Sequence, residues 1–242
     1  MRWKISKNIP ATAYPQLSRP KLLRLLEKLS PLVIHLLWPS SCVFCGALGE
    51  VCCASCLDAH FSRFGGLLSQ ENSSSSLEIA YGSLYGGEIR DLIHRLKYRE
   101  ERILGKHLGK ALGRRFFPLL QGATFIPLPL HKGSFRSYNQ ALLLAQGASQ
   151  VCGGSVWDCL YWKENAAPQT GKSREERQKL SSEALGFFGE TQGDQDAPFV
   201  LVDDVSTTAT TLRVAAELLE KEGYTVSRGL VCCYAPPGGI VL

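Results

Sequence analysis

The chain has 242 residues, of which 45% are hydrophobic and 20% are charged, as is typical of a globular protein with a hydrophobic core. No apolar run reaches the roughly 18 residues that a membrane-spanning helix needs. The first residues are basic, but no apolar run with a small-residue cleavage site follows them. We therefore expect no membrane span and no secretory signal, and we predict a cytoplasmic protein.

The net charge of +5 is unevenly distributed along the chain. Residues 1–38 contain seven Lys or Arg and one acidic residue, and residues 94–136 contain ten and two. Two interpretations of these basic segments stay open. They are solvated faces of helices, or they attract an anion such as a phosphate or a nucleic-acid backbone.

Residues 1–38 form the first predicted segment. Residues 1–18 are polar and show no apolar period, whereas Lys21 to Trp38 has the leucine spacing of a helix with a break at Pro31. Its leucine face is expected to pack on the rest of the protein. A peripheral contact with a membrane surface or a partner is the alternative.

Residues 39–67 form the second predicted segment, a metal-binding module. Five of the nine cysteines lie here, and four of them form two Cys-x-x-Cys pairs: Cys42, Cys45, Cys53 and Cys56. Two such pairs can hold a structural zinc ion in a tetrahedral site, and a chain without an export signal favours a metal over disulfides. Cys52 and His60 are alternative ligands. A redox-active dithiol is the competing interpretation.

A low-complexity linker is predicted over Leu68 to Ser76, and the third segment, residues 77–242, alternates strand and helix patterns. We predict an α/β fold with a mainly parallel sheet flanked by helices. The expected strands are 77–85, 124–130, 155–162, 199–202 and 225–233. The expected helices are 88–98, 103–117, 138–150, 173–182 and 210–222.

The strongest functional signal follows the apolar run Phe199 to Val202. Two aspartates come next, Asp203 and Asp204, and then a hydroxyl-rich loop before a helix pattern. Backbone N–H groups at a helix N-terminus favour a phosphate, and the carboxyl ends of parallel strands are where open α/β sheets bind ligands. Two adjacent carboxylates repel each other, which makes sense where they accept hydrogen bonds from a diol or help to hold hydrated Mg²⁺. The alternative is that one carboxylate only caps the turn.

This stretch resembles the phosphoribosyl-pyrophosphate signature of type I phosphoribosyltransferases. The resemblance implies that Asp203 and Asp204 bind the ribose hydroxyls, that the loop binds the 5′-phosphate, and that Mg²⁺ accompanies the ligand. The loop residues are Ser206, Thr207, Thr208, Ala209, Thr210 and Thr211. The family usually has glycine where this chain has Ala209. If φ is positive there, alanine costs about 1–2 kcal/mol.

Further motifs resemble the competence protein ComF family, over roughly residues 36–235. They are Leu-Lys-Tyr at 96–98, Pro-Leu-Pro-Leu-His at 127–131, Arg-Ser-Tyr-Asn-Gln at 136–140, and Gln169 to Arg177, which follow the cysteine cluster in the family's order. At Ser137 the family usually has glycine. The resemblance implies a type I phosphoribosyltransferase-like domain with N-terminal zinc knuckles. It also implies a role in natural transformation, in which single-stranded DNA is handled with DNA-uptake proteins at the cytoplasmic face of the inner membrane.

Basic side chains near these motifs are candidate contacts for pyrophosphate or DNA: Lys97, His131, Arg136, Arg174 and Arg177. Arginine and lysine both pair with phosphate oxygens, and the segment around Arg174 contains a glycine and could close over a ligand as a lid. The alternative is that these are solvated surface charges. Arg99 is a weaker candidate of the same kind.

Three functions remain open on the sequence alone. The first is a ComF-like protein that binds phosphoribosyl pyrophosphate and acts in DNA uptake. The second is an active phosphoribosyltransferase with an unidentified nucleobase acceptor, for which the sequence identifies no catalytic residue and no base-binding segment. The third is a sensor that binds the ribose phosphate without turnover.

Overall fold

The computed structural model describes residues 40–71, 76–130, 134, 136–163, 185–189 and 197–236. The chain divides into two compact units, Met1–Ser40 and Ser41–Leu242, and the description below concerns the second. The helix predicted within residues 1–38 and the charged helix predicted over 173–182 lie outside the described residues. Within the described part, no helix has the length and apolar character that crossing a membrane requires.

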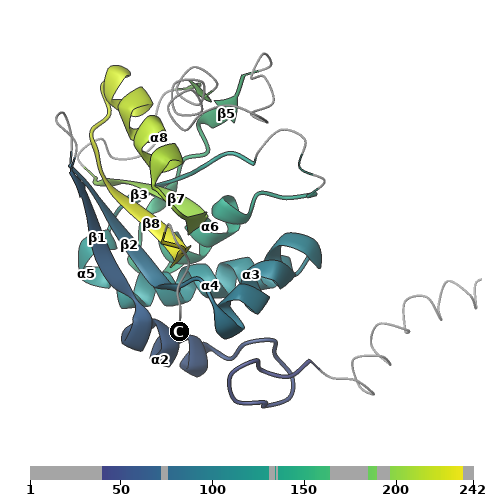
Figure 1. Ribbon diagram of the computed structural model, residues 1–242. Coiled ribbons are helices and arrows are strands. Elements are labelled where there is room, and N and C mark those ends of the chain that lie inside the picture. Colours follow the sequence, from purple (N-terminus) through teal and green to yellow (C-terminus); the bar gives the residue numbers. More distant parts are fainter. Residues whose placement is uncertain are drawn as a thin grey trace, which may run out of the picture. The chain divides into compact units, whose positions relative to one another are not determined.

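A six-stranded sheet forms the centre of this unit, in the order β1-β2-β8-β7-β3-β4 (Figure 1). Its strands are β1 (Gly66–Glu71), β2 (Ser76–Leu84), β3 (Thr124–Pro127), β4 (Ser155–Val156), β7 (Phe199–Ser206) and β8 (Val226–Tyr234). Every pair is parallel except β1 with β2. A separate two-stranded antiparallel sheet contains β5 (Leu160–Trp162) and β6 (Leu185–Phe187).

Helices cover both faces of the sheet (Figure 1). They are α2 (Ala54–Phe64), α3 (Gly87–Tyr98), α4 (Arg102–Arg115), α5 (Phe117–Leu120), α6 (Gln140–Cys152) and α8 (Thr210–Lys221). The even-numbered residues of β7, such as Val200 and Val202, pack in one core with α2, α3, α4 and α6. Leu201, on the other face, packs in a second core with α8 and the β5–β6 sheet. A strand buried on both faces reads as a continuous apolar run, which is why Phe199–Val202 stood out in the sequence.

Glycines allow two of the helices to pack closely. Gly109 of α4 lies against Gly147 of α6, and a Cβ built on Gly109 would stand only 2.1 Å from the Leu144 carbonyl oxygen. Any larger residue would therefore push these helices apart. This contact keeps α6 against the sheet, and the residues before α6 connect it to the end of β3.

The predicted fold class is confirmed: a mainly parallel sheet flanked by helices, with a small N-terminal cysteine module. Two predictions of local structure were wrong. Residues 68–71 of the expected linker belong instead to the edge strand β1, where the polar end of the strand, residues 69–71, suits an edge next to solvent. The single strand expected over 155–162 is divided into β4 and β5, which belong to different sheets.

Candidate functional site

The aspartate pair lies inside β7 and not after it. The strand continues to pair with β8 beyond the apolar run, with Asp203 opposite Val231 and Ser206 opposite Tyr234. Successive side chains of a strand point to opposite faces, so Asp203 and Asp204 leave the strand in opposite directions. The two carboxylates therefore flank the carboxyl end of a central strand.

Asp204 already has a cationic partner. The Lys97 ammonium, from the last turn of α3, lies 3.0 Å from Asp204 Oδ1, and the two side chains are only 19% and 10% exposed. An ion pair this sheltered from water is stronger than one on the surface, and removing either partner leaves a costly unpaired charge. Lys97, a candidate pyrophosphate contact in the sequence, thus neutralises one of the two carboxylates.

Asp203 is held in a state that favours its protonated form. Burial and repulsion by Asp204 raise the pKa of Asp203 to about 7, although the Asp204 backbone N–H, Lys97 and Arg136 act in the opposite direction. The Asp204 N–H donates to Asp203 Oδ1 at 2.8 Å. A carboxylate that is this costly to ionise gains stability from a ligand that brings hydroxyl donors or a cation to it. The pair is thus suited to a diol or to a hydrated divalent cation.

The hydroxyl-rich loop leads directly from β7 into α8. The Ser206 carbonyl accepts a hydrogen bond from the Ala235 N–H at 2.8 Å, which anchors the start of the loop to the end of β8. The Thr208 and Thr210 hydroxyls lie 2.8 Å apart at the helix start. The N-cap residue of α8 is Ala209, whose side chain cannot accept a hydrogen bond. The first backbone N–H groups of α8 therefore have no side-chain cap, and such groups suit an anion.

Ala209 adopts the left-handed conformation, with φ 55° and ψ 11°. Its side chain is buried, at 4% exposure. Glycine adopts this conformation without penalty, whereas an L-residue with a Cβ loses about 1–2 kcal/mol. The loop therefore has the backbone geometry for which the resemblance expects glycine, but it is built with alanine.

A second group of side chains lies beside the aspartates. A hollow of about 400 Å³ is lined by Lys97, Tyr98, Arg136, Tyr138 and neighbouring polar residues. The Arg136 guanidinium donates to Gln140 Oε1 at 2.9 Å and lies 5.9 Å from the centre of the Tyr98 ring. Both Lys97 and Arg136 act electrostatically on Asp203. These two candidates thus share one basic hollow next to the acid pair.

The sequence missed two positioning roles near this hollow. Asn139, read as a helix start, caps α6 by accepting from the Ala141 N–H at 3.0 Å, and its amide also donates to the Leu128 carbonyl at 2.9 Å. Gln140 is buried and holds Arg136. Asparagine is a preferred N-cap residue, which is a sequence signal for the first role, whereas nothing in the sequence marks the contact between Gln140 and Arg136. The remaining basic candidates, His131, Arg174 and Arg177, lie outside the described residues.

The four predicted zinc ligands come together in one place. The sulfur atoms of Cys42, Cys45, Cys53 and Cys56 all lie within 4.8 Å of one another. Cys53 Sγ is 3.6 Å from Cys42 Sγ and 3.8 Å from Cys45 Sγ. A tetrahedron with Zn–S bonds of about 2.3 Å has sulfur atoms about 3.8 Å apart. This cluster can therefore hold a metal such as zinc, in a site closed by four thiolates.

The thiols around this cluster differ in the ease with which they ionise. Burial raises the pKa of Cys42, but backbone N–H groups outweigh burial and lower it to about 6. The hydrogen bond between the Cys53 and Cys56 side chains lowers the pKa of Cys53 and raises the pKa of Cys56. Burial raises the pKa of Cys52, whose side chain belongs to the hydrophobic core. Because a zinc ligand must be a thiolate, Cys42 is far better suited to the metal than Cys52.

The alternative ligand His60 is engaged elsewhere. Its Nε2 atom hydrogen-bonds the Ser83 hydroxyl of β2 at 2.9 Å, and its ring lies between Phe44 and Phe64 with centroid distances of 4.9 and 4.7 Å. Burial lowers its pKa, which keeps the ring neutral. His60 joins the cysteine module to the sheet and is absent from the cysteine cluster.

Comparison with solved structures gives loose matches to phosphoribosyltransferases. A hypoxanthine phosphoribosyltransferase from Staphylococcus aureus matches with a TM-score of 0.32 and 15% identity, over 55% of this chain and 64% of that enzyme. A purine phosphoribosyltransferase from Pyrococcus horikoshii Ot3 matches with a TM-score of 0.30 and 20% identity, over 57% of this chain and 78% of that enzyme. The chain thus spans less than two thirds of the first of these proteins.

No protein-family model matches the chain, and no curated protein matches it in sequence. These structural neighbours are phosphoribosyltransferases, with low TM-scores of 0.32 and 0.30. Likeness at this level says nothing about what this chain binds, so its ligand has to be argued from its own residues.

Proposed function

We propose that the chain binds phosphoribosyl pyrophosphate, or a similar ribose 5-phosphate, at the carboxyl end of β7. The observation that carries this proposal is the arrangement of Asp203, Asp204 and the uncapped start of α8 along one continuous strand-loop-helix segment. The carboxylates offer acceptors for ribose hydroxyls. The first N–H groups of α8 and the threonine hydroxyls offer donors for a phosphate.

The charges around the site fit a ligand of this kind. A ribose carrying a 5′-phosphate and a pyrophosphate presents a diol at its centre and anions on both sides. In this proposal the two carboxylates flank the diol, and the pyrophosphate lies toward the hollow that Lys97 and Arg136 line. Mg²⁺ would link the pyrophosphate oxygens to this acidic edge, since it prefers oxygen ligands and keeps several of its waters.

Titration calorimetry with phosphoribosyl pyrophosphate and Mg²⁺ tests this proposal on the full chain. Asp203→Asn with Asp204→Asn should weaken binding at least 100-fold, because each lost charge-assisted hydrogen bond is worth about 1.5–3 kcal/mol. Asp58→Asn with Asp91→Asn removes the same number of carboxylates from α2 and α3 and should bind as the wild type does. If the wild-type chain shows no Mg²⁺-dependent binding, the ribose-phosphate proposal fails.

The broader role that we propose is that of a ComF-like protein in natural transformation, where incoming single-stranded DNA is handled at the cytoplasmic face of the inner membrane. Its support is the ordered set of motifs in the sequence, from the cysteine cluster to the acid-threonine segment. DNA-uptake proteins are the partners that this role implies. Loss of transformation on deletion of the gene, restored by the wild-type chain, is the expected result. Normal transformation without the gene would count against it.

An active phosphoribosyltransferase is the second proposal, supported by the acid pair and the hydroxyl-rich start of α8, which offer partners to the ribose and the phosphate. Transfer would break the bond between ribose C1 and pyrophosphate and form a bond from C1 to a nucleobase nitrogen. The β5–β6 sheet contacts the segment that follows β3, since the Trp162 Nε1–H donates to the Pro129 carbonyl at 3.1 Å. Pyrophosphate release with one nucleobase in a screen would favour turnover. Ligand binding without any release would favour a sensor or a DNA-handling role.

A further inference from the structure

A second hollow, of about 480 Å³, lies between the cysteine module and α3, and the proposed ribose-phosphate site does not use it. Its walls are Val43 beside the zinc cluster, Tyr85 at the end of β2, and the side chains of α3. The α3 residues are spaced so that they share one side of the helix: Arg90, Asp91, His94, Arg95 and Arg99. Lys97, in contrast, points to Asp204.

The hollow carries a surplus of positive charge. Three arginines face one acidic residue, Asp91. Arg90 lies 3.9 Å from Asp91, but both side chains are more than 60% exposed, so this pair is weak. Arg95 contacts Glu101 at 3.4 Å. No described side chain pairs with the Arg99 guanidinium. Guanidinium groups that are exposed and poorly paired are suited to phosphate oxygens, which they bind in a bidentate manner.

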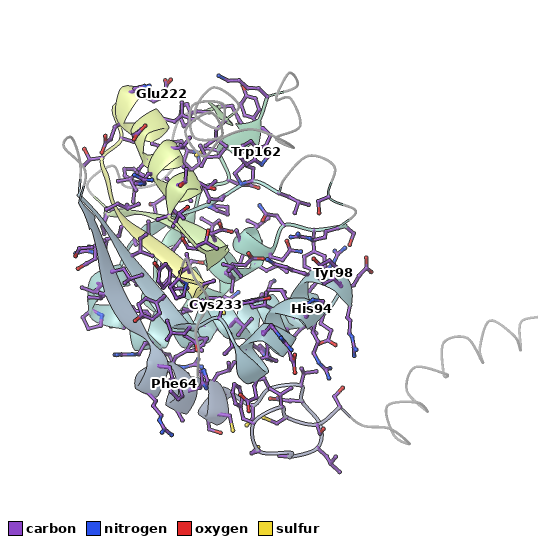
Figure 2. The ribbon with its side chains drawn as sticks, in the orientation of Figure 1. Phe64, His94, Tyr98, Trp162, Glu222 and Cys233 are labelled. Carbon is purple, nitrogen blue, oxygen red and sulfur yellow. The ribbon has the colours of Figure 1, made fainter. Side chains whose placement is uncertain are left out.

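Aromatic rings connect this hollow to the basic hollow beside the aspartates. His94 lines the first hollow and Tyr98 lines the second, and their ring centroids are 4.8 Å apart (Figure 2). Tyr98 is 64% exposed, although the His94 ring and the Arg136 guanidinium, 5.9 Å from the ring centre, both lie against it. The two hollows thus follow one another along α3, whose 12 residues span about 18 Å.

A surface that alternates basic groups with open aromatic rings matches a ligand that alternates phosphates with flat rings. We infer that the groove from Arg90 to Tyr98 binds single-stranded nucleic acid, with Arg90 and Arg99 on the phosphodiester backbone and Tyr98 stacked on a base. A duplex would not use Tyr98, because its bases are already stacked and paired. The inference rests on the DNA-handling part of the proposed function, for which it names the binding surface.

The test measures binding of a fluorescein-labelled oligo-dT to the full chain by anisotropy at several salt concentrations. Arg90→Glu with Arg99→Glu should weaken binding at least tenfold. It should also reduce the magnitude of the slope of log K against log salt by about 1.4, because about 0.7 counterion is released for each phosphate contact on a single strand. The control is Lys163→Glu with Lys221→Glu, which changes the net charge equally at exposed positions outside the groove. It should stay within about twofold of the wild type. Arg90→Gln with Arg99→Gln serves if the charge reversal disturbs folding.

Tyr98→Ala tests the stacking contact and should cost about tenfold, within the 1–3 kcal/mol expected for one base on one ring. Equal weakening by the groove variant and its control, or no binding by the wild type, would overturn the inference. So would a mononucleotide or inorganic phosphate that displaces the oligonucleotide at similar concentrations, since the groove would then take a small anion. An acidic polypeptide that displaces the labelled oligonucleotide as well as unlabelled oligo-dT does would also overturn the inference.

The same variants keep the two proposals apart. The groove variant should bind phosphoribosyl pyrophosphate normally, and Asp203→Asn with Asp204→Asn should bind oligo-dT normally. Absence of ribose-phosphate binding in the wild type, together with intact oligo-dT binding, would remove the first proposal and leave this inference standing. The reverse result would remove only the inference.

Discussion

Asp203 is the residue whose environment is most unusual for its type. Its folded-state pKa of about 7 lies above the value of about 3.9 for an unfolded chain. Between these values the folded protein holds a proton that the unfolded chain has released. Folding stability therefore falls as pH rises from about 4 to 7, and the full penalty is present above pH 7. Asp204, Lys97 and Arg136 are the charged groups that act on it.

Asp203→Asn should accordingly stabilise the ligand-free protein at pH 8 and have little effect at pH 4.5. Asparagine keeps the oxygen that accepts from the Asp204 N–H but removes the charge. We expect a rise in Tm of about 2–4 °C at pH 8, measured by thermal unfolding. The control is Asp91→Asn, which makes the same chemical change at an exposed position of α3. A gain that does not depend on pH would contradict this account.

Ala209 gives a second test at the scale of one residue. Ala209→Gly removes the penalty of positive φ, while glycine gains freedom in the unfolded chain, so we expect a net gain of up to about 1 kcal/mol in unfolding free energy. Ala216→Gly, at a buried interior position of α8, should instead cost about 1 kcal/mol. Denaturant unfolding measures the unfolding free energy of both variants. A decrease in both would refute the proposed backbone strain at Ala209.

At the scale of elements, the cysteine module is defined by its four sulfur atoms and by α2, which follows Cys53 at once. We expect about one zinc per chain, measured by atomic emission on protein prepared without metal-chelating resin. Cys45→Ser, at an exposed position, should abolish zinc binding. Cys52→Ala should retain it, since Cys52 lies outside the cluster. Retention of zinc by Cys45→Ser would mean that the ligand set is different.

At the scale of the whole described unit, the cysteine module shares a core with the α/β domain. Leu57 and Phe61 of α2 are fully buried in the cluster that contains Leu112 and Val200. Arg114 pairs with Asp58 at 2.9 Å on the outside of the same contact. A module that contributes to the common core is expected to unfold together with it.

Removal of zinc should therefore lower the Tm of a single cooperative unfolding transition. It should not produce a separate transition at a lower temperature. Calorimetric scans with and without a chelator measure this directly. The chelator should leave the melting of a Cys45→Ser variant unchanged, because that variant has no metal to lose. Two resolved transitions in the metal-free protein would show that the module unfolds independently.

Much of the fold was predictable because local patterns and tertiary packing agree. The helices α3 and α8 occur where their apolar spacing predicted them, and so does the buried strand that begins at Phe199. The errors came from segments with weak local signals. The edge strand β1 ends in polar residues, and the short strands β4 and β5 are separated by residues 157–159, which no sequence pattern marked as a break. Strand pairing depends on distant residues, which a local pattern does not report.

The sequence alone determined the chemical groups of both candidate sites: the Cys-x-x-Cys spacing, the acid pair after an apolar strand, and the hydroxyl-rich start of a helix. Each is a local pattern, so spacing along the chain suffices to recognise it. Only the tertiary structure decided that Asp203 and Asp204 leave β7 on opposite faces, that Lys97 neutralises Asp204, and that Ala209 has positive φ. These facts depend on how far the β7–β8 pairing extends and on which face of the sheet receives α3. Both are set by contacts between residues far apart in the chain.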